Sequence, residues 1–105
     1  MQDIINAFCQ YRGVEVADIF NYDRFQKNYF TRYMIWHYLH CAKGISVGCL
    51  SKTFKRNRPS IFRGIRLLKH QFKYDKRLCA EYNGIVEKIE GATEVAPSGV
   101  MEEMN

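Results

Sequence analysis

Apolar side chains recur at every third or fourth position along most of the chain, which is the spacing of amphipathic helices. Residues 3–11 predict a first helix that Gly13 ends, and residues 14–20 predict a short second one. Residues 25–43 hold the longest pattern and are apolar nearly all the way round a helix. We therefore expect this helix, which Gly44 ends, to lie at the centre with the others packed around it.

Two further helices are separated by a turn that contains a proline. Ser46 is suited to cap the first of them, over residues 47–54, because its hydroxyl can accept a hydrogen bond from a free backbone N–H. Pro59 lacks an N–H and disfavours the helical conformation in Arg58, so it predicts a turn over residues 55–58. Pro59 itself fits the first turn of the next helix, where its missing donor costs nothing.

The helix that starts at Pro59 has two different faces. One face is apolar and the other carries basic residues, which assigns the first to the core and leaves the second for phosphates and bases. The apolar face holds Ile61, Ile65, Leu68 and Phe72, and the opposite face holds Pro59, Arg63, Arg66 and His70. After a break over residues 73–76, the apolar pattern of residues 78–89 predicts a last helix that ends before Gly91.

These elements predict an all-α protein, a bundle of five or six helices without a sheet. A length of 105 residues allows one domain, which we place at residues 1–90. Residues 91–105 have little periodicity and predict a disordered tail. The chain has neither a secretory signal nor a long apolar stretch, so we expect a cytoplasmic protein without a membrane partner.

The charge is concentrated in one segment of the chain. The net charge is +5, and from Lys43 to Arg77 eleven lysines and arginines stand against one acid, Asp75. The last fifteen residues, in contrast, hold three glutamates and no base. A basic stripe of this kind favours a polyanionic partner, nucleic acid first and an anionic membrane surface second.

Other kinds of site find little support. The four cysteines lie 32, 8 and 30 residues apart in apolar contexts without a C-x-x-C pair, which favours free core thiols over two disulfides. His37, His40 and Cys41 are metal-ligand types on one helix, but no fourth ligand follows by spacing, so we expect no metal and no cofactor. An enzyme built on Cys41 and His37 is the weakest alternative, and the lack of a glycine-rich phosphate loop argues against a nucleotide. The aromatic residues of the long helix we interpret as core packing rather than as a platform for single strands: Tyr29, Phe30, Tyr33, Trp36 and Tyr38.

The two helices around the proline turn have the lengths of a helix-turn-helix, in which the second helix enters the major groove of DNA. Most basic residues of the turn and the start of the second helix are arginines, and a guanidinium can bind a phosphate or a guanine through two parallel hydrogen bonds. We therefore predict a partner of double-stranded DNA. The predicted base contacts are Asn57, Arg58, Pro59, Ser60 and Arg63, and the predicted phosphate contacts in this segment are Lys52, Lys55, Arg56, Arg66 and Lys69.

Several positions also match a known family. Arg32, Met34 and Leu39 stand where that family has Arg, Met and Leu, and Ser46, Leu50 and Phe54 stand on its Ser, Ile and Phe. Residues 55–61, KRNRPSI, lie over its Gly-Arg-Asp-His-Thr-Thr-Val. On these residues the chain, from about Asp3 to Ile89, resembles the C-terminal DNA-binding domain of the bacterial replication initiator DnaA, an all-helical relative of the Trp-repressor fold.

The resemblance implies a function and one further contact. It implies a basic loop before the long helix that reaches the minor groove, which adds Arg24 and Lys27 to the expected phosphate contacts. Because Asn57, Arg58 and Pro59 replace the family's Asp, His and Thr, the family's own binding box is not expected to carry over. The family's ATPase domain lies upstream of its DNA-binding module, whereas this sequence starts one helix before it. We therefore expect a replication- or transcription-related regulator, of phage or mobile-element type, or an excised domain.

One alternative remains open. A module of the same fold that has lost sequence-specific DNA readout would use its basic surface to bind a protein partner with an acidic surface. Composition and spacing do not separate the two hypotheses. Measurements of duplex affinity after the replacement of single arginines separate them.

Overall fold

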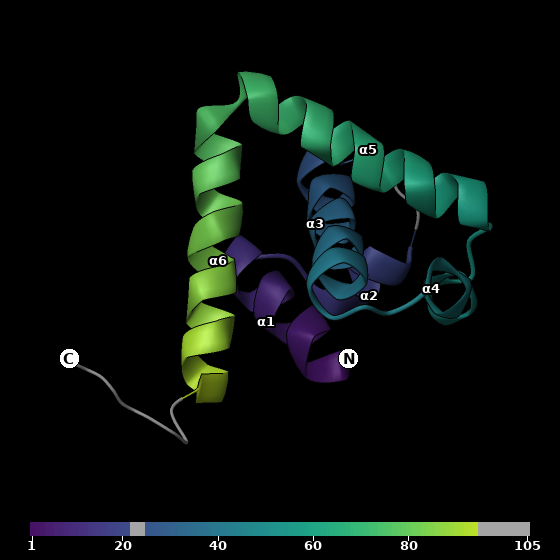
Figure 1. Ribbon diagram of the computed structural model, residues 1–105, viewed down its shortest axis with the longest axis horizontal. Coiled ribbons are helices and arrows are strands. Elements are labelled where there is room, and N and C mark those ends of the chain that lie inside the picture. Colours follow the sequence, from purple (N-terminus) through teal and green to yellow (C-terminus); the bar gives the residue numbers. More distant parts are fainter. Residues whose placement is uncertain (22–24, 95–105) are drawn as a thin grey trace.

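The computed structural model describes residues 1–21 and 25–94, with backbone only for residues 92–94. Within these ranges the chain forms six α-helices, one π-helical turn and no strand (Figure 1), so the prediction of an all-α fold is confirmed. None of the described helices has an apolar stretch long enough to cross a membrane. The elements are α1 (Gln2–Arg12), α2 (Val16–Phe20), α3 (Gln26–His37), the π-helical turn η1 (Tyr38–Ala42), α4 (Val47–Phe54), α5 (Arg58–Tyr74) and α6 (Lys76–Glu94).

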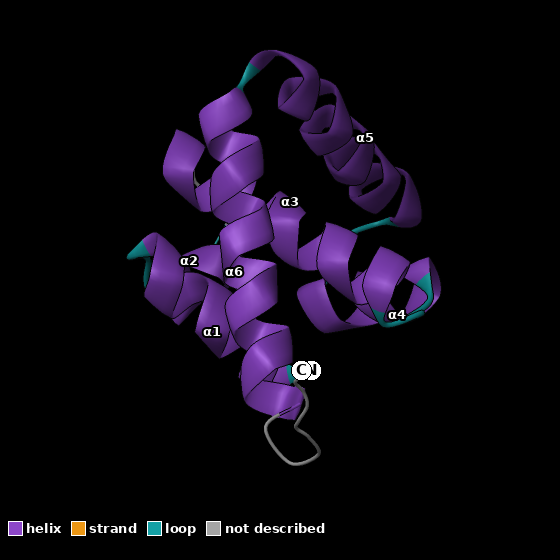
Figure 2. Ribbon diagram, turned by 60° about the vertical axis from the view of Figure 1, so that its left-hand side comes forward, coloured by secondary structure: helices purple, strands orange, loops and turns teal. Residues whose placement is uncertain are grey.

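Helix α3 occupies the centre of the molecule, as its apolar pattern predicted. It contacts α1, α2 and α5, and α5 crosses over it while α6 stands at one side (Figure 1). Turned by 60°, the molecule shows α1 beside α6, with α4 and α5 on the other side of α3 (Figure 2). The expectation that α3 is apolar nearly all round is wrong, however, because Asn28, Thr31 and Arg32 are buried in it alongside its apolar residues.

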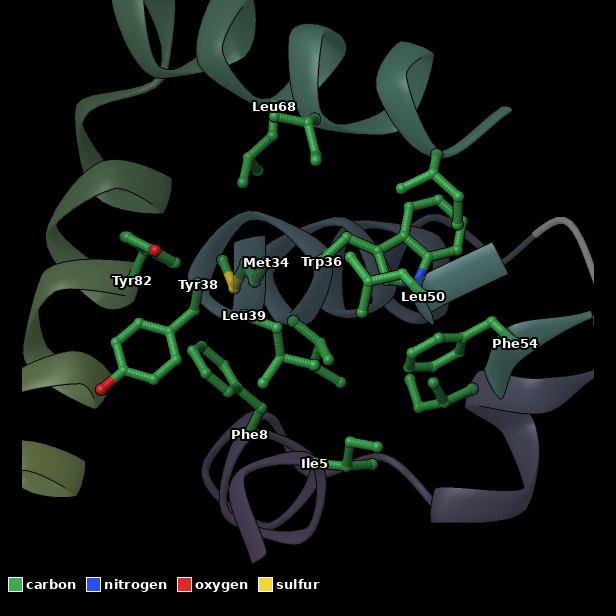
Figure 3. Packing of buried hydrophobic residues seen from close by; sticks show 14 of the residues in the cluster. Ile5, Phe8, Met34, Trp36, Tyr38, Leu39, Leu50, Phe54, Leu68 and Tyr82 are labelled. Carbon is green, nitrogen blue, oxygen red and sulfur yellow. The ribbon is translucent and has the colours of Figure 1, made fainter. Parts of the chain in front are cut away.

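The core has an aromatic group on each of two sides of the C-terminal end of α3 (Figure 3). On the α4 side the Trp36 indole meets the Phe54 ring edge-on, with ring centroids 5.8 Å apart. On the α1 and α6 side, Phe8 packs between Tyr38 and Tyr82 at centroid distances of 5.8 and 6.0 Å. The described part of the chain thus buries one continuous core to which all six α-helices contribute.

Two arginines are buried in this core, and the periodicity of the sequence predicted neither of them. Arg32 is 3% exposed, and its guanidinium donates to the backbone oxygens of Ile19 (2.8 Å), Asn21 (2.8 Å) and Asp18 (3.3 Å). These carbonyls lie at the end of α2, where a helix leaves its last acceptors without partners. Arg32 therefore fastens α2 to α3 through charge-assisted hydrogen bonds.

Arg12 makes a similar connection beside the neighbouring residue of α3, Thr31. Its Nε donates to Thr31 Oγ1 (2.9 Å) and its Nη1 donates to Glu81 Oε1 (2.7 Å). Because Arg12 is 8% exposed, the ion pair with Glu81 is well shielded from water on the arginine side. One side chain thereby joins α1, α3 and α6.

Helix α3 does not end as a regular α-helix but continues into the π-helical turn η1. The N–H of Lys43 reaches back five residues to the carbonyl of Tyr38 (3.2 Å), and Gly44 then ends the segment with a positive φ of 70°. The Nδ1 atom of His40 lies 2.8 Å from the Ile45 carbonyl oxygen and steadies this end. Gly44 was predicted to end the helix and does so, whereas the π-turn was not foreseen.

His37, at the last α-helical position, lies against α6. Its Nδ1 forms a hydrogen bond of 2.7 Å with the Tyr82 hydroxyl, and burial lowers the pKa of His37. The nearby Lys69 and His40 lower this pKa further. Among the residues that the structure describes, no three histidines, cysteines or acids are placed to hold a metal ion.

The four cysteines, all within the described ranges, are free. The expectation that all four are core thiols is nevertheless wrong. Cys9 is buried, which together with Asp18 and Glu15 raises the pKa of its thiol to about 11. Cys41 and Cys49 are exposed, because they lie on the outer sides of η1 and α4, and Cys79 is half-buried.

The end of the chain also differs from the prediction. The break between the last two helices is confined to Asp75, whose Oδ1 accepts the Leu78 N–H (3.0 Å) as a helix cap. Helix α6 then continues through Gly91 to Glu94, so residues 91–94 are helical and do not belong to a tail. Gly91 is exposed with open space around it, and a glycine there weakens a helix without breaking it. The rest of the predicted tail, residues 95–105, lies outside the described residues.

Candidate nucleic-acid interface

Helices α4 and α5 are joined by a turn of three residues, and together with it they form what we call the α4–α5 unit, residues 47–74. Ser46 caps α4 as predicted, since its Oγ accepts the Cys49 N–H (3.1 Å). Lys55 turns the chain with a φ of 55°, the one positive φ at a non-glycine residue in the described ranges. The Ser51 hydroxyl donates to the Arg56 carbonyl and braces the turn from α4.

Helix α5 begins one residue earlier than predicted. Arg58 is its first residue, so the expectation that Pro59 keeps Arg58 out of the helix is wrong. The reason is the cap at Asn57, whose Oδ1 accepts the Ser60 N–H (2.9 Å) and thereby fixes the start of the helix. This local hydrogen bond outweighs the conformational bias that a proline imposes on the residue before it.

Asn57 is therefore a structural residue of the turn as well as a predicted base contact. We expect Asn57→Ala to lower the free energy of unfolding by about 1 kcal/mol, the usual cost of losing an N-cap. Asn57→Asp, which keeps the capping oxygen, should retain most of the stability. Urea unfolding followed by circular dichroism measures both, and equal stability of Asn57→Ala and the wild type would contradict the capping role.

The two faces of α5 are arranged as the sequence predicted. Ile61, Ile65 and Leu68 are buried against the core, and Phe72 is half-buried. Pro59, Arg63, Arg66 and His70 are exposed on the other side. Helix α5 thus presents a basic surface while its apolar side holds it on α3.

The predicted DNA contacts do not form one cluster but fall into several groups. Arg58 lies across α4, because a Cβ atom added at Gly48 would be 2.9 Å from its Nη2 atom. Arg56, Ser60 and Arg63 surround a pocket of about 170 Å³ between α5 and α3. Arg66 and Lys69 flank a second, more apolar hollow of about 350 Å³ beside Phe62 and Ile65.

The remaining predicted contacts lie at the margins or outside the described ranges. Lys52 and Lys55 are exposed at the end of α4. Lys27 is exposed at the start of α3, where it lines a third hollow with Arg12 and Asp75, away from the pocket that holds Arg63. Arg24 lies outside the described residues.

Two residues that the sequence assigned to core packing also line the pocket between α3 and α5. Tyr33 and Trp36 form its α3 side, opposite Ser60 and Arg63. Burial raises the pKa of Tyr33, while the charges of Arg32, Arg56 and Arg63 act in the opposite direction. A sequence signal exists for this contact in Gly64, a glycine in the middle of a helical pattern, which often marks a close approach of two helices.

No protein-family model matches the chain, and the comparison with curated proteins gives no match either. The resemblance to the C-terminal domain of DnaA therefore stays a prediction from the residues. The function of the α4–α5 unit has to be inferred from its geometry and charge.

Proposed function

We propose that this protein binds double-stranded DNA through the α4–α5 unit, used as a helix-turn-helix, and acts by occupying a duplex site as a replication- or transcription-related regulator. The observation that carries the proposal is the charge of this unit. Residues 47–74 contain no aspartate or glutamate, and the exposed surface of their turn and second helix presents Arg58, Arg63, Arg66 and Lys69. Such a surface attracts the phosphates of a duplex regardless of its sequence.

The arrangement of the two helices supports the same proposal. Helix α5 is 17 residues long, capped at Asn57, and packed on the central helix α3, so it forms a rigid rod. Arg58 and Ser60 lie at the N-terminal end of α5. In a helix-turn-helix, this end of the second helix contacts the edges of the bases. In this proposal the shorter α4 acts as the first helix of such a motif, which crosses the DNA backbone.

Salt dependence tests the proposal directly. If about six basic side chains engage phosphates, the logarithm of the association constant should fall against the logarithm of the salt concentration with a slope of about −5. The measurement is a fluorescence-anisotropy titration of a labelled mixed-sequence duplex at several NaCl concentrations. A flat salt response, or no binding even at low salt, would contradict the proposal.

Single arginines separate this function from its rival. Arg66→Ala, at a predicted phosphate contact, should weaken duplex binding and make the salt slope shallower by about 1. Arg63→Ala, at a predicted base contact, should also weaken duplex binding, and both variants should keep the helical circular-dichroism spectrum. Both residues are exposed, so neither substitution removes core packing. A spectrum that changes together with affinity would assign the loss to the fold instead of the contact.

The rival is a module that binds an acidic protein partner, and one feature favours it. Phe62 is 50% exposed beside the hollow of about 350 Å³, which Arg66 and Lys69 flank. An apolar hollow with basic walls suits an acidic amphipathic peptide. In that case the chain would bind such a partner while Arg63→Ala and Arg66→Ala leave a weak duplex affinity unchanged.

A further inference from the structure

The pocket between α3 and α5 is lined by side chains from three segments of the chain and is open to solvent, and we call it the α3–α5 pocket. Tyr33 and Trp36 line it from α3, Arg56 lines it from the turn, and Ser60 and Arg63 line it from α5, around a volume of about 170 Å³. Its lining is therefore mostly polar and basic although it lies at a junction of two packed helices. A pocket of this composition suits a small polar anion better than an apolar ligand.

The shape of the pocket depends on a close approach of the two helices. A Cβ atom added at Gly64 would lie 2.7 Å from the ring of Tyr33 and 2.8 Å from that of Trp36. Because the side chain of Gly64 is a single hydrogen atom, α5 can lie this close to α3. The polar side chains at the N-terminal end of α5 are thereby brought against the aromatic residues of α3.

The electrostatic environment of the pocket is strongly positive. Three arginines act on the Tyr33 hydroxyl, and no acidic residue in the described ranges lines the pocket. The charge of Arg32 is fixed in place by its bonds to the end of α2. Arg63, in contrast, forms no hydrogen bond or ion pair with any residue that the structure describes, so its donors remain for a ligand.

The pocket also has donors that suit a tetrahedral oxyanion. Arginine can give two parallel hydrogen bonds to one phosphate, and the hydroxyl of Ser60 is a further donor. Trp36, which is 2% exposed, adds an aromatic wall beside these donors. Its indole extends from α3 toward the side of the core where Leu50 and Phe54 of α4 lie (Figure 3).

We propose that the α3–α5 pocket is a phosphate site, formed by Arg56, Ser60 and Arg63 over Tyr33 and Trp36, and that it holds one backbone phosphate of the bound duplex. The second half of this statement rests on the proposed function. The proposal changes the expected roles of two residues of α5, because Ser60 and Arg63 then contact the DNA backbone instead of the bases. Phosphate contacts of this kind fix the position of a recognition helix on the duplex.

The chain has a single tryptophan, so the pocket carries its own reporter. In the ¹⁵N-labelled 105-residue chain the Trp36 indole N–H gives one resonance, which can be followed during two titrations. The first adds sodium phosphate at constant ionic strength against a sodium chloride blank. The second adds a mixed-sequence duplex whose binding is measured in parallel by anisotropy.

We expect the indole resonance to shift saturably in both titrations. Arg63→Ala should weaken the phosphate response about tenfold, the loss of one charge-assisted hydrogen bond. Arg63→Gln tests the same charge with a side chain closer in size. The matched control is Arg66→Ala, an exposed arginine of the same helix that lines the other hollow, and it should keep the phosphate response.

The possible outcomes of the two titrations test the phosphate site and the proposed DNA binding separately. An indole resonance that moves with neither probe, while the duplex binds, overturns the phosphate site and leaves DNA binding standing. A response to phosphate without a response to a duplex that does bind overturns the backbone contact and assigns the pocket to a free phosphate. A response to phosphate in a protein that binds no duplex refutes the proposed function and, with it, the backbone contact.

Discussion

Replacement of Arg32 by alanine is expected to lower the free energy of unfolding by about 3 kcal/mol or more. The guanidinium donates to three backbone oxygens, those of Asp18, Ile19 and Asn21, and is almost fully buried. A hydrogen bond from a charged group contributes about 1.5–3 kcal/mol, and each carbonyl left without a donor adds a cost of its own. Because the substitution also empties space in the core, the effects on packing and hydrogen bonding have the same sign.

Urea unfolding of the full chain measures this effect, with Arg32→Lys and Arg63→Ala as comparisons. Lysine keeps the charge but has one nitrogen in place of the planar guanidinium, so we expect an intermediate loss of stability. Arg63 is exposed on a neighbouring helix, and its removal should change stability by less than about 0.5 kcal/mol. Equal stability of Arg32→Ala and Arg63→Ala would contradict the role of Arg32 in linking α2 to α3 by hydrogen bonds.

The parts of the fold that could be predicted from the sequence are those that depend on local rules. The cap at Ser46 and the end at Gly44 follow from the chemistry of single residues and their neighbours. The division of α5 into a buried and an exposed face follows from a period of 3.6 residues. These predictions succeeded because tertiary contacts reinforce what each segment favours by itself.

The parts that could not be predicted depend on contacts between distant segments. Arg12 and Glu81 are 69 residues apart in the chain, and nothing near either residue indicates the ion pair. The π-turn after His37 likewise has no side-chain pattern of its own, because it is a change in backbone hydrogen bonding. Helix α6 passes Gly91 because a lone glycine weakens a helix without ending it.

The candidate interface shows the same limit. The list of basic residues could be drawn from composition, but their grouping could not, since it depends on how α5 crosses α3. Arg63 belongs with Tyr33 and Trp36, whereas Arg66, three residues later, belongs with Phe62 and a different hollow. Half-buried Tyr33 and buried Trp36 therefore pack against the core and also line the pocket.

Gly64 is the position where that crossing is most sensitive to a small change. In an isolated helix the substitution of glycine by alanine gains up to about 1 kcal/mol. At Gly64 the new Cβ would lie 2.7 Å from Tyr33 and 2.8 Å from Trp36, far inside van der Waals contact. Forcing extra atoms into a packed core costs about 1–3 kcal/mol, so the loss exceeds the gain and Gly64→Ala should be destabilising.

Gly64→Val should be more severe, with a loss of about 3 kcal/mol in the free energy of unfolding, because its two methyl groups cannot both avoid the rings. The matched control is Gly84→Ala, in the middle of α6, where an added Cβ has no atom within 4 Å. That substitution should raise stability by about 0.5–1 kcal/mol, through the helix propensity alone. Opposite signs for Gly64→Ala and Gly84→Ala in urea unfolding are the expected result. A gain at both positions would mean that α5 does not approach α3 so closely, and the α3–α5 pocket would lose its structural basis.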